Sequence, residues 1–159
     1  MSAIFGLINL NQEAINPAKL SQMAKALRHR TQTGKEYNSN HLALGPNYYS
    51  NKNFMSCCAG EVYNLEEIQK DLKLKNASLN ETIAQAYQKY GNSIFEKLNG
   101  KWAIAIYDIE KNSLTLSRDR AGEEPLYWTK EGSTFYFASE IKALHKIRTS
   151  VSPNEEAIE

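Results

Sequence analysis

The stretch Lys101-Trp-Ala-Ile-Ala-Ile-Tyr-Asp-Ile109 decides the fold, because it is a nearly continuous run of apolar residues. Such a run is typical of a β-strand that is covered on both faces. The chain then turns at Glu110 to Asn112, and Leu114 and Leu116 predict a return strand. The second half of the chain is therefore expected to form a sheet that other elements cover.

Several other stretches have the composition of strands. Residues 3–10 are apolar with Gly6 inside the run, which predicts a buried strand that begins at the start of the chain. Gly132 lies between two aromatic stretches and predicts the turn of a hairpin. Further strands are expected at residues 42–44, 53–63, 126–129 and 135–138.

Helices are expected in two groups. Asn16-Pro17 is a typical helix start, and apolar residues then recur at helical spacing up to Leu27, which predicts a helix that ends in the basic Arg28-His-Arg30. Further helices are expected at residues 65–74, 78–90, 94–98 and 139–147. Strands combined with two groups of helices predict an α+β protein with layered sheets and the helices outside.

Length and charge exclude several classes of protein. A chain of 159 residues is one domain, or one domain with a tail. The net charge of +1 argues against a strongly basic nucleic-acid binder. No apolar run is long enough to span a membrane, and the N-terminus lacks the basic region of a signal peptide. We therefore expect a cytoplasmic protein that binds neither nucleic acid nor membrane.

Cysteines and histidines do not predict a metal site. Cys57 and Cys58 are adjacent, so they form no disulfide framework, and in a strand they point to opposite faces. His29, His41 and His145 have no spacing that suits metal ligands. Buried free thiols and ordinary histidines are expected instead.

Four stretches, in this order, match motifs of one known family. Met1-Ser-Ala-Ile-Phe-Gly6 is similar to Met-Cys-Gly-Ile-Phe-Gly, and Ala59-Gly-Glu-Val-Tyr-Asn64 to Asn-Gly-Glu-Ile-Tyr-Asn. Leu116 to Tyr127 resembles Leu-Ala-Arg-Asp-Arg-Phe-Gly-Ile-Lys-Pro-Leu-Tyr, and Phe137-Ala-Ser-Glu-Ile-Lys-Ala-Leu144 is similar almost letter for letter. The chain thus resembles the class II glutamine amidotransferase domain, the N-terminal nucleophile hydrolase module of asparagine synthetases.

This resemblance implies an architecture. The family folds as a four-layer αββα sandwich of two antiparallel sheets. Residues 1–147 are expected to form that domain, with 148–159 as a tail or linker towards a missing synthetase domain. The Ser-Gly-Gly-x-Asp pyrophosphate loop of that synthetase domain does not occur in this chain, so ATP and Mg are expected only outside it.

The family's reaction begins with a nucleophile at the mature N-terminus, whose own α-amine is the base. The resemblance gives the nucleophile position to Ser2, where the family has cysteine, and a serine is the weaker nucleophile. This role also requires that Met1 is removed. The family's His-Arg-Gly-Pro-Asp loop corresponds to His29-Arg-Thr-Gln-Thr33.

Other parts of the glutamine site are replaced. Gly60 and Glu61 are retained, but Ala59 stands at the position of the asparagine that helps to form the oxyanion hole. Leu79 stands at the position of the aspartate that binds the substrate ammonium. The stretch Leu44-Gly-Pro-Asn-Tyr-Tyr49 lacks the arginine that binds the substrate carboxylate. The resemblance therefore indicates a vestigial pocket, which Tyr48, Tyr49 and Leu79 are expected to fill in part.

The leading hypothesis is a degenerate, non-hydrolysing amidotransferase-like domain with a structural role. The parent enzyme would be an asparagine-synthetase-like ligase that forms amide bonds with ATP, similar to β-lactam synthetases or lasso-peptide macrolactam cyclases. The expected partner is a C-terminal synthetase domain or a separate synthetase subunit, and a homodimer is a further expectation. Two alternatives stay open: an active N-terminal serine amidohydrolase or glutaminase, and a free-standing protein-interaction module.

Overall fold

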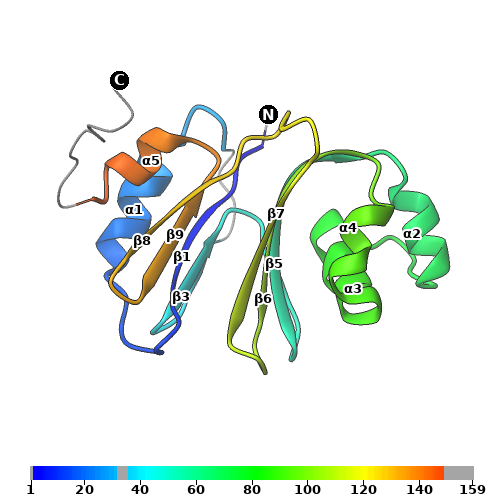
Figure 1. Ribbon diagram of the computed structural model, residues 1–159, viewed down its shortest axis with the longest axis horizontal. Helices are drawn as coiled ribbons and strands as arrows, with labels where there is room; N and C mark the ends of the chain where they lie inside the picture. The colour runs from blue at the N-terminus through cyan, green and yellow to red at the C-terminus, as the bar shows by residue number, and fades with distance from the viewer. Residues whose placement is uncertain (1, 32–35, 149–159) are drawn as a thin grey trace, which may run out of the picture.

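Two antiparallel sheets stack face to face, with helices on both outer sides, in the computed structural model (Figure 1). The structure describes residues 2–31 and 36–148. The expected four-layer αββα sandwich is confirmed. Its elements are β1 (Phe5–Asn9), α1 (Pro17–Ala26), β2 (Tyr37–Asn38), β3 (Leu42–Gly45), β4 (Tyr49–Ser50), β5 (Phe54–Val62), α2 (Leu65–Asp71), α3 (Leu79–Tyr90), the 3₁₀ turn η1 (Gly91–Ser93), α4 (Ile94–Lys97), β6 (Gly100–Asp108), β7 (Ser113–Arg118), β8 (Tyr127–Glu131), β9 (Thr134–Ala138) and α5 (Ile141–His145).

The strand orders explain which sequence runs are most apolar. One sheet has the order β2-β3-β1-β9-β8, and the other has the order β4-β5-β6-β7. β6 lies inside its sheet and pairs with β5 along the whole ladder, from Phe54 opposite Asp108 to Val62 opposite Gly100. The nearly continuous apolar run at residues 101–109 is therefore an internal strand that is covered on both faces.

Apolar side chains fill three layers. The layer between the sheets contains fully buried residues such as Ile4, Ile8 and Phe137. A second layer packs the outer face of the first sheet against α1 and α5, and a third packs the second sheet against α3 and its neighbours. Within the described residues, no helix is long and apolar enough to cross a membrane.

The helices on the second sheet leave and rejoin that sheet at one narrow point, which we call the neck. The backbone N–H of Tyr63 donates to the carbonyl of Asn99 at 2.7 Å. The Asn64 side chain donates to the carbonyl of Lys97 at 2.8 Å and accepts from the N–H of Asn99 at 2.9 Å. The neck therefore joins the end of β5 to the start of β6.

Several boundaries differ from the sequence-based expectation. α1 ends at Ala26, so the basic residues 28–30 lie in the turns that follow it. The last helix, expected at residues 139–147, is α5 at Ile141–His145, and the Ser139 hydroxyl before it accepts a hydrogen bond from the N–H of Ile4 at 2.9 Å. The two-residue strands β2 and β4 were not expected. The expected tail lies, from residue 149 onward, outside the described residues.

Candidate functional site

The chain start and the end of β5 meet at the candidate site. The backbone N–H of Gly60 donates to Oγ of Ser2 at 3.1 Å. Gly60 has a φ of 99°, and a Cβ there would lie 2.2 Å from the carbonyl oxygen of Lys101. Glycine is therefore required at this bend in β5. Ser2 and Gly60 are brought together as the resemblance implies.

Two separate hollows open near Gly60. A cavity of about 120 Å³ is lined by Ser2, Ala3, Arg30, Thr31, Pro46, Asn47 and Cys58. An open groove of about 870 Å³ runs along residues 60–67 and includes Glu61, Leu79 and Asn99. Glu61 thus lies in the groove, whereas Ser2 lines the smaller cavity. The structure therefore does not gather the three predicted site residues in one of these hollows.

The plug expected from Tyr48, Tyr49 and Leu79 is not found at the cavity beside Ser2, because none of the three lines it. Tyr48 meets Tyr37 edge to face, with ring centroids 5.4 Å apart, and packs against the layer between the sheets. Tyr49 packs against the layer beneath α3. Leu79 begins α3 and lines the open groove. Both tyrosines complete apolar layers, which is why neither lines the cavity beside Ser2.

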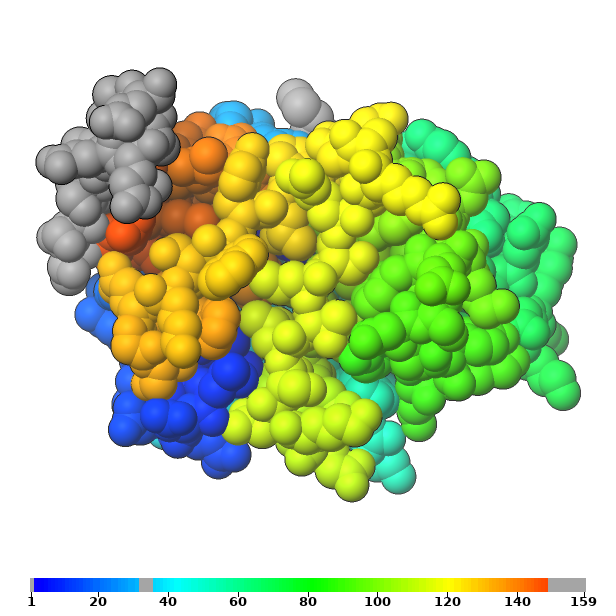
Figure 2. Space-filling view, viewed as in Figure 1, coloured from blue at the N-terminus to red at the C-terminus, as the bar shows by residue number. Residues whose placement is uncertain are grey.

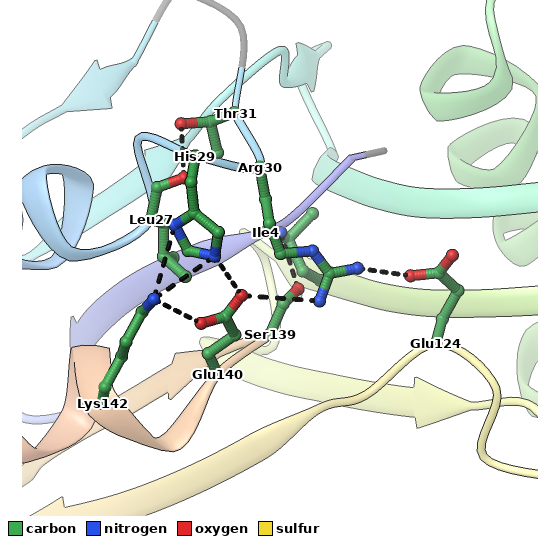
Figure 3. A network of polar contacts seen from close by, with 9 residues as sticks. All are labelled: Ile4, Leu27, His29, Arg30, Thr31, Glu124, Ser139, Glu140 and Lys142. Atoms are coloured by element: carbon green, nitrogen blue, oxygen red, sulfur yellow. Dashed lines mark hydrogen bonds and ion pairs between the residues drawn. The ribbon is translucent and has the colours of Figure 1, made fainter.

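Arg30 enters the Ser2 cavity from the turn after α1 and carries two ion pairs (Figure 3). Its guanidinium lies 3.4 Å from a carboxylate oxygen of Glu124 and 3.8 Å from one of Glu140. The side chains of Arg30 and Glu124 are only 14% and 13% exposed. Nε of Arg30 is buried and has no hydrogen-bond partner among the residues that the structure describes. Most of the guanidinium's charge is therefore engaged inside the protein.

Glu140 is the hub of this network. Nε2 of His29 lies 2.7 Å from its carboxylate, and Nζ of Lys142 lies 2.9 Å from it. Burial opposes ionisation of Glu140, but the hydrogen bonds from Lys142 and His29 outweigh it and lower the pKa of the carboxyl. Glu140 is therefore ionised at neutral pH and holds the turn after α1 against α5.

Asp119 fixes the loop that carries Glu124. Its carboxylate accepts hydrogen bonds from the backbone N–H groups of Glu123 and Glu124, both at 3.0 Å, and from that of Trp102 at 3.3 Å. Burial opposes ionisation of Asp119, yet these backbone hydrogen bonds lower its pKa below the usual 3.8.

The fixed loop brings Glu124 directly over Gly60. Cγ of Glu124 lies 2.8 Å from the point that a Cβ on Gly60 would occupy. The Glu124 side chain therefore packs beside the backbone oxyanion donor that the resemblance leaves in this chain, while its carboxylate lies 3.4 Å from the Arg30 guanidinium.

The cavity also contains the thiol of Cys58, whose pKa is raised. Cys58 lines the cavity, but burial and the neighbouring Cys57 raise its pKa well above 9.0. Burial raises the pKa of Cys57 to about 12. Since the thiolate is the attacking form of cysteine, both side chains, which stay protonated at neutral pH, are poor nucleophiles there.

Sequence reasoning missed Arg30 and Glu124 as site residues. The signal for Arg30 was its position in the stretch that corresponds to the family's His-Arg-Gly-Pro-Asp loop, where the arginine is retained. Glu124 stands where the quoted family motif has lysine before its proline, so a reversal of charge was readable in the sequence. Their pairing was not readable, because 94 positions separate them along the chain.

Comparison with known proteins agrees with the fold and the motifs. A family profile described as the glutamine amidotransferase domain matches residues 1–159. Asparagine synthetase [glutamine-hydrolyzing] 1 of Bacillus subtilis is 26% identical over the whole chain, which covers 29% of that relative. Asparagine synthetase B of Escherichia coli is 28% identical over 91% of the chain, which covers 30% of it. The chain thus spans less than a third of these curated relatives.

Solved structures share the fold at low identity. The glutamine phosphoribosylpyrophosphate amidotransferase of B. subtilis, complexed with ADP and GMP, matches 90% of this chain and 43% of its own, with a TM-score of 0.65 and 17% identity. A structure described as the allosteric regulatory enzyme of purine biosynthesis matches 91% of this chain and 43% of its own, with a TM-score of 0.67 and 15% identity. With a family profile that matches the full length, the chain belongs to the glutamine amidotransferase domain family, and the resemblance to asparagine synthetases drawn from its motifs is confirmed.

Proposed function

We propose that this domain does not hydrolyse glutamine and has a structural role in an asparagine-synthetase-like enzyme that forms amide bonds with ATP. The observation that carries the proposal is the environment of Gly60. Its N–H is already engaged by Oγ of Ser2, and Glu124 packs over it. The one remaining backbone donor is therefore occupied by the nucleophile's own hydroxyl, and the Glu124 side chain packs against the same glycine.

The loss of the second oxyanion donor supports the same proposal. Ala59 stands at the position of the family's asparagine, and its methyl group is buried in the layer between the sheets. Loss of one such donor typically lowers a rate by about 10²–10³. Leu79, in place of the aspartate, offers no charge to a substrate ammonium. These losses act in the same direction as the weaker nucleophile.

ATP and Mg belong, in this proposal, to a synthetase domain or subunit that acts together with this one. The curated relatives are more than three times as long as this chain, which leaves room for such a domain in proteins of their kind. Ammonia from glutamine would not be needed if the substrate of the parent enzyme supplies its own amine. The amidotransferase-like domain would then serve as a folded platform.

The decisive experiment measures glutamate release from glutamine by the purified chain, after mass spectrometry of the intact protein has established whether Met1 is removed. We expect no release above that of the Ser2→Ala variant. We also expect none from Ser2→Cys, because the restored thiol still lacks its second oxyanion donor and its substrate contacts. Turnover that Ser2→Ala abolishes would overturn the proposal.

An active N-terminal serine amidohydrolase is the second candidate, and one observation favours it. Arg30 lines the same cavity as Ser2, so a cation does lie beside the former nucleophile position. This activity requires a free amine on Ser2. A substrate panel of short amides and N-acyl amino acids, compared between the chain and Ser2→Ala, separates the two candidates. A retained Met1 rules the second one out.

A further inference from the structure

An apolar groove opens between the edge strands of the two sheets. Leu114 and Leu116 of β7, Trp128 of β8, Leu10 and Phe135 line a cavity of about 170 Å³ there. Trp128 is 63% exposed, and the other four are half-buried although they pack against the layer between the sheets. Figure 2 shows the yellow-green β7 region uncovered between the orange-yellow β8 region and the green helices.

The opposite edge of the sandwich is closed. Tyr37 of β2 and Tyr48, next to β4, meet edge to face and pack against the same inter-sheet layer. An aromatic pair thus covers that layer on one side. On the β7 side, leucine side chains remain partly exposed to water. The free-energy cost of this exposure grows with the apolar area that is exposed.

The free edge of β7 lacks the usual protection against pairing along residues 113–117. The sheet order ends at β7. In an edge strand, alternate residues direct their backbone N–H and C=O groups towards the neighbouring strand, and the residues between them direct theirs to the free side. Residues 113–117 contain no charged residue and no proline, which are common protective devices on edge strands. Thr115 contacts the Tyr87 hydroxyl at 3.0 Å and Ser117 accepts from Trp102 Nε1 at 3.1 Å, so β7 is held in place on one face.

We propose that β7 pairs in antiparallel fashion with β7 of a second copy of this chain, with the two-fold axis at Thr115. This inference is independent of the proposed function. In this register Leu114 stands opposite the partner's Leu116, on the face of the open groove. Each copy therefore covers the leucines of the other, and the two-fold symmetry closes the assembly as a dimer.

Charge agrees with this register. Arg118, the one charged residue of β7, stands opposite the partner's Asn112, so no like charges meet across the seam. β8 is the less suitable edge, because exposed Lys130 lies within the strand, where a charge opposes pairing, whereas Arg118 is the last residue of β7. Trp128 lies beside the leucines in the same groove and adds apolar surface to the seam. The groove thus fits an uncharged strand with apolar residues at alternate positions, which β7 itself is.

Sedimentation equilibrium of the full chain tests this pairing, with a monomer mass of 18.0 kDa as the reference. We expect the average mass to rise towards that of a dimer with concentration. In Leu116→Lys an ammonium would be buried in the seam without a partner, so we expect the dissociation constant to rise by about 100-fold. Ile141→Lys, at an exposed isoleucine of α5, is the matched control and should leave it unchanged.

A cross-link provides a second measurement that does not depend on the folding of Leu116→Lys. Opposite residues of paired strands lie about 4.5–5.5 Å apart at Cα, within the span of a disulfide. Thr115→Cys should therefore form a disulfide-linked dimer under mild oxidation, whereas Thr129→Cys on β8 should not. The proposal is wrong if the chain stays monomeric up to about 1 mM, or if only Thr129→Cys cross-links.

Discussion

The layer between the sheets and the Ser2 end of the same sheets depend on different forces. The layer is apolar, with side chains such as Ile4 and Phe137 fully removed from water. The Ser2 end is held by carboxylates: Asp119 fixes a loop, and Glu124 pairs with Arg30. Hydrophobic burial stabilises the framework, whereas hydrogen bonds and ion pairs stabilise the site. We therefore expect that substitutions can disrupt the framework and the site separately.

The largest effect is expected in the apolar layer. Phe137→Ala should lower the free energy of unfolding by about 3–5 kcal/mol, because it leaves a cavity in a close-packed layer. Phe135, on the same face of β9 but half-buried at the open groove, is the matched control and should lose clearly less when changed to alanine. Urea denaturation of both variants measures this. Equal losses would show that the layer is not better packed than its edge.

A backbone change at the junction of the two regions is expected next. Gly60→Ala should destabilise the protein by about 2–4 kcal/mol, because the added methyl would strain a positive φ and clash with the Lys101 carbonyl. Gly132 also has a positive φ, 58° against 99° at Gly60, but nothing lies within 4 Å of a methyl added there. Thermal unfolding should therefore show a smaller loss for Gly132→Ala. The clash explanation fails if the two substitutions cost the same.

The third prediction concerns the carboxylate that fixes the loop. Asp119→Ala should cost about 2–3 kcal/mol at pH 7, since buried backbone N–H groups lose their acceptor. The native pKa of Asp119 is lowered, so its stabilisation is present above the usual value of 3.8 and is lost as the pH falls through the native pKa. The difference between wild type and variant should thus shrink in acid. Urea midpoints at pH 7 and in the acid range measure it, and a constant difference would contradict the assignment.

The smallest effect is expected at the ion pair over Gly60. Glu124→Gln should change the free energy of unfolding by less than about 1 kcal/mol, because the pair is long and Arg30 keeps its contact with Glu140. Glutamate release should stay at the background, since the second oxyanion donor is still absent. Glu123→Gln on the same loop is the control. Glutaminase turnover in Glu124→Gln alone would mean that this one charge suppresses the reaction.

The framework was largely predictable from the sequence because its pattern is strong. The run at residues 101–109 and the alternation around Gly132 have the periods of buried and paired strands, and β6 and the β8–β9 hairpin follow from them. The two-residue strands β2 and β4 have no period to detect. The end of α1 was misplaced because the basic residues after it suit either a last helical turn or the loop beyond.

The site was predictable only where one motif supplied both partners of a contact. Ser2 and Gly60 follow from aligned stretches of the family. The pairs of Arg30 with Glu124 and Glu140 depend on how three distant segments pack, and nothing local in the sequence records that packing. The misplaced plug has the same cause, because the tertiary fold turned Tyr48 and Tyr49 towards apolar layers and away from the cavity.

The neck between β5 and β6 places both ends of residues 63–99 side by side. The chain leaves and re-enters the sheet at backbone positions that Asn64 joins by hydrogen bonds. The distance between the two exit points is therefore set by the ladder, whereas the apolar face of α3 covers the outer side of the sheet. A reporter domain whose termini lie close together could be inserted beside the neck without shifting the register of the strands beneath, provided that α3 is kept in place.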